Sequence, residues 1–156
     1  GDTGDTGPAG PAGPTGAPGP NPTATAGFAA NTTGAIINVL LGGTSIPLPS
    51  AKLLSPDITV NGANTVFTIN TAGRYRISYH INTAASILMG SRLMINGSAN
   101  TASIISPVVS LSGYANEIVI DLAAGATVSL QFFGLIGLTA LLGNSAGASL
   151  MIIRLS

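Results

Sequence analysis

Alternating apolar and polar residues mark the segment after residue 26 and predict β-strands. In the run 74–82, every second residue is a large apolar one, and the residues between them are polar or charged. Side chains of a strand point alternately to its two faces, so this pattern predicts a strand with one buried face. That face carries Tyr75, Ile77, Tyr79 and Ile81.

Other short runs repeat the same period of two. Phe67 and Ile69 are separated by a threonine, and Ile118, Ile120 and Leu122 alternate with other residues. The dipeptides 61–62 and 96–97 are both Asn-Gly, which favours tight hairpin turns. No long window has a helical period, so we expect an all-β domain of about eight to ten strands.

The segment 148–155 is apolar at successive positions and not only at alternate ones. Leu150 and Ile152 would face one side of a strand, and Met151 and Ile153 the other. A strand that is apolar on both faces has to be covered on both, here by the domain core and by a neighbouring subunit. The segment 135–142 suggests the same. The candidates for the core or for a trimer interface are Phe67, Tyr75, Ile77, Tyr79, Leu130, Phe132, Leu150, Met151, Ile152 and Ile153.

The first 21 residues follow a different rule, because glycine occupies every third position in seven Gly-X-Y triplets. Only glycine fits at the crowded axis of a collagen triple helix, and proline pre-sets its backbone torsions. We therefore expect a collagen-like stalk at 1–21, a linker at 22–26 and a head at 27–156. The repeat begins at the first residue, which suggests a longer protein. The repeat glycines are Gly1, Gly4, Gly7, Gly10, Gly13, Gly16 and Gly19.

A triple helix requires three chains, and seven triplets correspond to a rod of roughly 60 Å. Its outward-pointing Y positions include Thr3, Thr6 and Thr15. We interpret these three threonines as possible O-glycosylation sites.

The composition also indicates self-association. Only 6% of the residues are charged and 46% are hydrophobic, whereas globular proteins average roughly 25% charged residues. A domain of this size leaves about 30–40% of its unfolded-chain surface exposed, so it cannot hide this much aliphatic surface alone. The uncharged run 122–143 is long enough for a membrane helix. However, Val128, Leu130 and Phe132 alternate with polar residues in a strand period, which disfavours a membrane span.

Chemistry-bearing residues are scarce. The chain has no cysteine and a single histidine, His80, and the segment 22–156 has three acidic residues. These leave little scope for catalysis, a metal site or a cofactor, so we expect none of them. The net charge is zero with no basic cluster, which argues against nucleic acid as a partner. Arg74 and Arg76 could pair with Glu117 or Asp121 within one subunit or between two, and the sequence leaves this open.

Two motifs in the head resemble a known family. Residues 67–80 (FTINTAGRYRISYH) are similar to the Phe strand, turn glycine and aromatic strand of the C1q/TNF-like jelly roll, with Ile77 where Phe is usual. Residues 122–131 (LAAGATVSLQ) resemble its later glycine-turn motif, with Ala126 where Asp is usual. The resemblance covers most of 27–156 and implies an all-β, C1q/TNF-like jelly-roll head that forms a homotrimer. The clustered acidic loops of calcium-binding C1q heads are missing here.

The uncharged, aliphatic character of the head is most similar to the C-terminal domain of BclA-type collagen-like glycoproteins of the bacterial spore surface, the exosporium. This resemblance implies a structural filament whose trimeric head nucleates the stalk and forms the exposed tip. Its partners would be further copies of itself, other spore-surface proteins and host surface molecules. A C1q-like ligand-recognition head and a phage or bacterial fibre tip are the alternatives.

Overall fold

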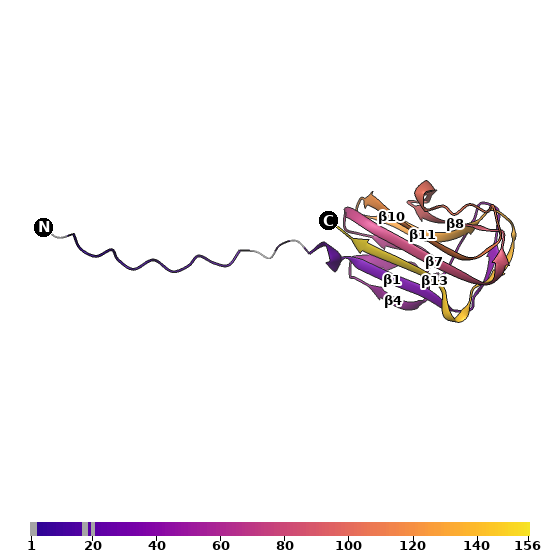
Figure 1. Cartoon of the computed structure of the whole chain (residues 1–156), viewed down its shortest axis with the longest axis horizontal. Coiled ribbons are helices and arrows are strands. Elements are labelled where there is room, and N and C mark those ends of the chain that lie inside the picture. The colour runs from indigo at the N-terminus through magenta and orange to yellow at the C-terminus, as the bar shows by residue number, and fades with distance from the viewer. Residues whose placement is uncertain (1–2, 17–18, 20) are drawn as a thin grey trace.

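The computed structural model describes residues 3–16, 19 and 21–156. Residues 3–16 are extended and exposed along one side of Figure 1, and the head follows as a single body. In one chain, no other atom lies within 4 Å of the Cβ position of the repeat glycines from Gly4 to Gly19. The repeat glycine Gly1 and the repeat prolines Pro18 and Pro20 lie outside the described residues. The triple helix itself stays a prediction.

The head is built almost entirely from β-strands, which confirms the all-β prediction. The described residues form more strands than the expected eight to ten, because several strands are only two to four residues long. The strands are β1 (Ala26–Thr33), β2 (Ile36–Val39), β3 (Thr44–Ser45), β4 (Ser50–Leu54), β5 (Ile58–Val60), β6 (Phe67–Ile69), β7 (Gly73–Ile87), β8 (Gly90–Ile95), β9 (Ser98–Ala99), β10 (Leu111–Leu122), β11 (Ala126–Phe133), β12 (Gly137–Ala140) and β13 (Gly143–Arg154).

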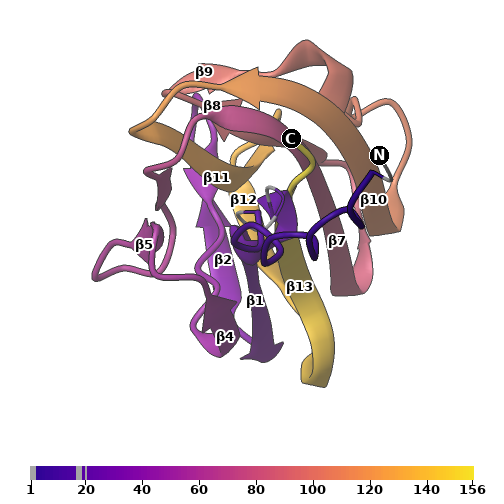
Figure 2. The same ribbon diagram turned by 90° about the vertical axis from the view of Figure 1, so that its left-hand side faces the viewer.

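These strands form two facing sheets and a small third one. One sheet has five strands in the order β10-β7-β13-β1-β4. The other has six, in the order β5-β6-β11-β8-β9 with β3 attached to β11, and β12 pairs with β2. The paired strands of the described residues are all antiparallel. Neighbours such as β1 and β13 come from opposite ends of the chain, as Figure 2 shows from the stalk side.

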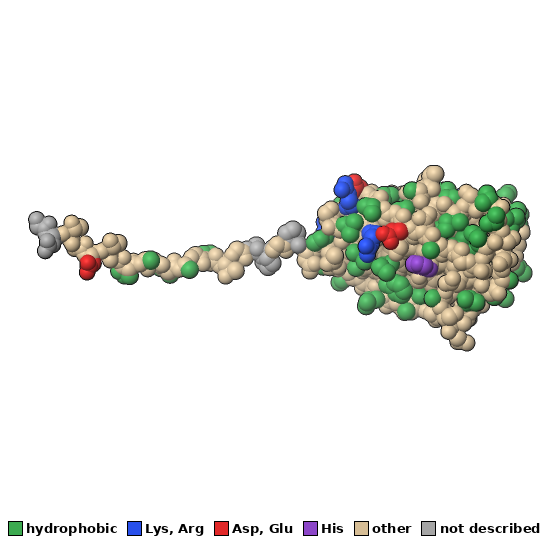
Figure 3. Space-filling model, in the orientation of Figure 1, with side chains coloured by type: hydrophobic (Ala, Val, Ile, Leu, Met, Phe, Trp, Pro, Cys, Tyr) green, Lys and Arg blue, Asp and Glu red, His purple; other side chains and the backbone are tan. Residues whose placement is uncertain are grey.

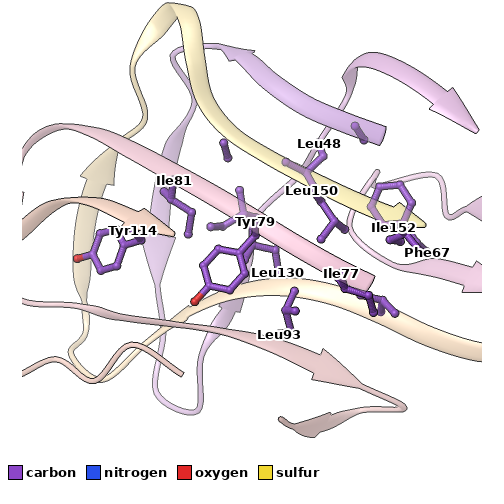
Figure 4. Packing of buried hydrophobic residues seen from close by; sticks show 14 of the residues in the cluster. Leu48, Phe67, Ile77, Tyr79, Ile81, Leu93, Tyr114, Leu130, Leu150 and Ile152 are labelled. Carbon is purple, nitrogen blue, oxygen red and sulfur yellow. The ribbon is translucent and has the colours of Figure 1, made fainter. Parts of the chain in front are cut away.

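The core lies between the two large sheets and is made mostly of aliphatic and aromatic side chains. Figure 4 shows Tyr79 from β7 and Leu150 from β13 pointing toward Leu130 and Leu93 of the other sheet. Buried phenol groups are satisfied: the Tyr79 hydroxyl lies 2.9 Å from Ser91 Oγ and donates to the Ser103 carbonyl at 2.7 Å. Burial raises the pKa of this tyrosine. A hydrogen-bonded phenol can fill a core without leaving an unpaired polar atom.

Strands β1 and β13 run the length of the head and define its two ends. At the stalk end, where the chain enters, Ala26 pairs with Ile153. At the far end, Thr33 pairs with Gly143 after a bulge in β1. Strands β2 and β12 follow and precede these far-end residues, so they lie at the end of the head away from the stalk (Figure 1).

Helical structure in the described residues is limited to two 3-10 turns, Pro22–Ala24 and Thr101–Ser103. Within that part of the chain, no helix has the length and apolar character needed to cross a membrane.

Candidate self-association surface

The outward face of the five-stranded sheet is apolar over three of its strands. Across β4, β1 and β13, Leu53 lies opposite Phe28, and Phe28 lies opposite Met151. In the next row, Ala26 lies opposite Ile153. Directly opposed residues of antiparallel strands share a face. These five residues therefore form one continuous patch, which we call the apolar half.

The apolar half encloses a shallow hollow of about 350 Å³, lined by Ala26, Gly27, Phe28, Leu53, Met151 and Ile153. Leu53 is 77% exposed and Met151 is 38% exposed. An open hollow lined almost wholly by carbon is typical of a surface that another apolar surface covers.

The outward face of the six-stranded sheet is different. Thr59, Thr68 and Thr127 lie in one row across β5, β6 and β11. In another row, Arg92 of β8 lies opposite Gln131, and its Nε donates to Gln131 Oε1 at 2.7 Å. Of the outward faces of the two large sheets, the one with a continuous apolar patch is therefore that of the five-stranded sheet.

The other two strands of the five-stranded sheet, β7 and β10, present a polar half. Arg74 and Asp121 are directly opposed and form two hydrogen bonds, with Nε 2.9 Å from Oδ1 and Nη2 3.3 Å from Oδ2. Arg76 Nε lies 3.9 Å from Glu117 Oε1. The hydrogen bond with Arg74 lowers the pKa of Asp121, and the same bond raises the pKa of Arg74. Arg74 and Arg76 therefore each have a carboxylate partner within one subunit.

A second, polar hollow of about 240 Å³ lies in this half, lined by Ser78, His80, Ala115, Asn116 and Glu117. Within the part of the chain that the structure describes, no side-chain hydrogen bond joins the imidazole of His80 to these neighbours. A bonded nucleophile and base, which covalent catalysis uses, is therefore not formed here. The described residues also contain no cluster of three or more potential metal ligands.

At the stalk end, one carboxylate organises the entry of the chain. Asp57 Oδ2 accepts hydrogen bonds from the hydroxyls of Thr25 and Thr71, and Oδ1 accepts one from Ser55 at 2.7 Å. The bond from Thr25, followed by that from Thr71, lowers the pKa of Asp57 to about 2. The Ser55 hydroxyl also accepts from the Ala26 amide. This network fixes the start of β1 relative to β4 and β5.

The sequence-predicted residues separate into distinct places. Met151 and Ile153 lie on the outward apolar half, and Thr3, Thr6 and Thr15 are exposed along the extended segment. Phe28 and Leu53 belong to the apolar half but lack a strong sequence signal, because neither lies in a long alternating run. The remaining core or interface candidates are buried between the sheets of one chain: Phe67, Tyr75, Ile77, Tyr79, Leu130, Phe132, Leu150 and Ile152.

Several solved structures of animal proteins have the same fold. The globular domain of zebrafish complement 1qA protein has 15% identity and a TM-score of 0.56, and covers 85% of this chain and 98% of that one. The Eiger TNF of S. frugiperda has 14% identity and a TM-score of 0.61, covering 87% and 94%. Murine APRIL at pH 5.0 has 12% identity and a TM-score of 0.59, covering 84% and 98%. These similarities confirm the C1q/TNF-like jelly-roll prediction.

No curated protein sequence matches the chain at a significant level. A family model does match it: the BclA C-terminal domain, over residues 27–156. This match covers the whole of the predicted head and agrees with the motifs read from the sequence. The chain therefore belongs to the BclA C-terminal domain family.

Proposed function

We propose that this chain is the subunit of a homotrimeric filament on the outer surface of bacterial spores, with a structural and not an enzymatic role. The observation that carries this proposal is the apolar half of the five-stranded sheet. Its side chains are open to solvent in one chain, next to a core that is already complete. In this proposal, the apolar half binds other copies of the same chain.

The stoichiometry of three rests on the Gly-X-Y repeat, since a collagen triple helix contains three chains. Three heads that are joined at their stalk ends pack side by side around the continued axis of the stalk. Their lateral faces then meet, and the outward face of the five-stranded sheet is such a lateral face (Figure 1). Membership of the BclA C-terminal domain family supports this arrangement.

The energetics favour covering this face. Full burial of one large apolar side chain contributes about 1.5–3 kcal/mol, and a stable interface buries roughly 1,200–2,000 Å² in total. The arginines of the polar half have partners within their own chain, so covering them leaves no unpaired charge. The hollow beside His80 is lined by polar groups that ordered water could bridge.

Exchange of Met151 for aspartate tests the interface. Because Met151 points outward and is partly exposed, the single head should fold, while a charge in the apolar half should disfavour association. We expect light scattering to give a trimer mass for the wild type and a monomer mass for Met151→Asp. The matched control is Leu41→Asp, an exposed leucine at the far end, which should remain trimeric. A monomeric wild type, or a trimeric Met151→Asp variant, contradicts the proposal.

The location is tested separately by immunogold labelling of spores, vegetative cells and phage particles. Label on the outer spore layer supports the proposal, including exposure of the far end to host surfaces. Label confined to phage particles would indicate a fibre tip, and soluble ligand capture without spore label would indicate a recognition head. Sugars on Thr3, Thr6 and Thr15 are part of the same proposal, and unmodified stalk threonines in native material would contradict that part.

A further inference from the structure

The exposed large apolar side chains of the head gather at one end. Of the 14 such residues, seven lie in β2, in β12 or in the loops that adjoin these two strands. Three more, Leu88, Val108 and Val109, lie in the loops after β7 and before β10, and the other four lie elsewhere. Figure 3 shows hydrophobic side chains grouped on the end of the head away from the stalk. We call the group the far-end patch: Ile36, Leu40, Leu41, Leu88, Val108, Val109, Leu135, Ile136, Leu138 and Leu142.

The most prominent part of the far-end patch is held rigidly. The Gly43 amide donates to the Leu40 carbonyl at 3.0 Å and closes a tight turn, and Arg92 Nη2 donates to the Gly42 carbonyl at 3.0 Å. Gly43 has a φ of +101°, a backbone conformation that favours glycine, and its backbone packs closely against the end of the Gln131 side chain. This bonded turn leaves Leu41 88% exposed. A rigid turn that presents a leucine to solvent loses little conformational entropy on binding.

Charge is absent from the segments that build the patch. Residues 34–43 and 134–143 contain no Lys, Arg, Asp or Glu. Arg92, which contacts the turn, is already bonded to Gln131 and Gly42 and lies 4.2 Å from the centre of the Phe133 ring. In Figure 3, the visible Lys, Arg, Asp and Glu side chains of the head lie toward the stalk end. A partner of the patch therefore needs apolar surface, and it does not need charge of either sign.

This inference rests on the proposed trimer, in which the other two subunits do not cover the far-end patch. In the proposed trimer the heads meet through lateral faces, and the far end points along the filament axis, away from the stalk. The patch also lies apart from the two hollows described above, which are lined by residues of the five-stranded sheet. Leucines that protrude from the surface, as Leu41 does at 88% exposure, suit a fluid apolar phase, into which side chains can insert.

We propose that the far-end patch binds lipid bilayers whose headgroups carry no net charge, by inserting Leu41, Leu138 and their neighbours into the boundary of the hydrocarbon region. Each inserted leucine gains the free energy of apolar burial, and the three tips of a trimer would add their contacts on one membrane. The lack of basic residues predicts little preference for anionic lipids and little effect of salt.

The test is co-flotation of the full chain with phosphatidylcholine vesicles. The double variant Leu41→Ser/Leu138→Ser should bind at least tenfold less, because both leucines are more than 70% exposed in the wild type. The matched control, Leu155→Ser, removes a leucine that is 40% exposed at the stalk end and should change binding less than twofold. Binding confined to vesicles that contain phosphatidylserine, or equal losses in both variants, would overturn the proposal.

The particle mass measured without vesicles separates this proposal from the trimer. If the wild type floats with vesicles through Leu41 and Leu138 but has a monomer mass, the lipid-binding proposal stands and the trimer proposal is overturned. A trimer that does not float overturns the lipid surface alone. A third outcome is that the wild type forms pairs of trimers and does not bind vesicles, while the double variant forms single trimers. This outcome would show that the patch binds a second trimer, and it would overturn the lipid proposal.

Discussion

The two ends of the head are built from the same long strands but are held by different interactions. At the stalk end, the Asp57 carboxylate accepts hydrogen bonds from three hydroxyls that belong to the chain entry and to neighbouring loops. At the far end, backbone segments approach closely: a Cβ at Gly34 would lie 3.1 Å from the Cα of Gly143. Polar groups therefore organise one end, and steric fit organises the other.

Because of this difference, the two ends should respond to different perturbations. Added volume should disrupt the far end, because backbone atoms there cannot move aside as a flexible side chain can. Protonation should weaken the stalk end, because its network depends on one ionised carboxylate. The outward surfaces differ as well, since the stalk end carries the ion pairs and the far end carries the uncharged patch.

The largest effect is expected from Gly147→Ala in β13. A Cβ at this position would lie 2.5 Å from the Leu142 carbonyl oxygen and 3.1 Å from that of Asn31. The backbone has to shift, and we expect the free energy of unfolding to fall by about 3 kcal/mol. Denaturant unfolding measures this loss. Gly62→Ala is the control, since nothing lies within 4 Å of its Cβ position. Equal stabilities of the two variants would mean that the far end is not tightly packed.

Asp57→Asn should have the next largest effect, now at the stalk end. Asparagine keeps the shape of the side chain, but its amide nitrogen cannot accept the hydroxyl hydrogens of Thr25 and Thr71. Because the site is partly open to solvent, we expect a loss of about 1 kcal/mol in the free energy of unfolding. Denaturant unfolding at pH 7 checks this value. An unchanged stability would show that the network does not hold the entry of β1.

The strand pattern and the core were largely predictable from the sequence, because burial of alternate residues follows directly from strand geometry. The alternation over 74–82 predicted the inward face of β7, and Tyr75, Ile77, Tyr79 and Ile81 are all fully buried. Asn96 and Gly97 do form a two-residue hairpin turn between β8 and β9, with positive φ at both residues.

Other features could not be predicted from the sequence, because they depend on contacts between residues that are far apart in the chain or on the detailed geometry of a loop. The Asn61–Gly62 dipeptide was expected to form a tight hairpin, but Asn61 opens a longer loop and accepts from the amides of Thr65 and Val66. Gln131 lies on the polar outward face of β11, as the alternation predicts, but the turn at Gly43 buries it there. The apolar half and the Asp57 network likewise join residues from separate strands, so only the register of the sheets brings them together.

Low pH should destabilise the stalk end in particular, because its network depends on the ionised Asp57. The pKa of Asp57 is lowered from an ordinary 3.8 to about 2 in the folded chain, chiefly by the Thr25 hydroxyl. A lowered folded-state pKa adds stability that is present above pH 4 and is lost as the pH falls from about 4 to about 2. The stability difference between wild type and Asp57→Asn should therefore be largest near neutral pH and vanish near pH 2. Comparing the two proteins at each pH removes the effects of the other carboxylates, which both proteins share. A stability difference that stays constant from pH 7 to pH 2 would contradict the lowered pKa of Asp57.

The smallest effect is expected from Arg74→Gln, although this residue forms the best-aligned ion pair of the stalk end. Arg74 and Asp121 are both well exposed, so water and salt screen their attraction in a single head. In the Met151→Asp background, where the heads should be monomeric, the melting temperature should not change measurably at low or high salt. A loss seen only in the trimer would place the pair at the edge of the subunit contact. A clear loss in the monomer would instead show that surface charge, and not only the Asp57 network, holds the stalk end.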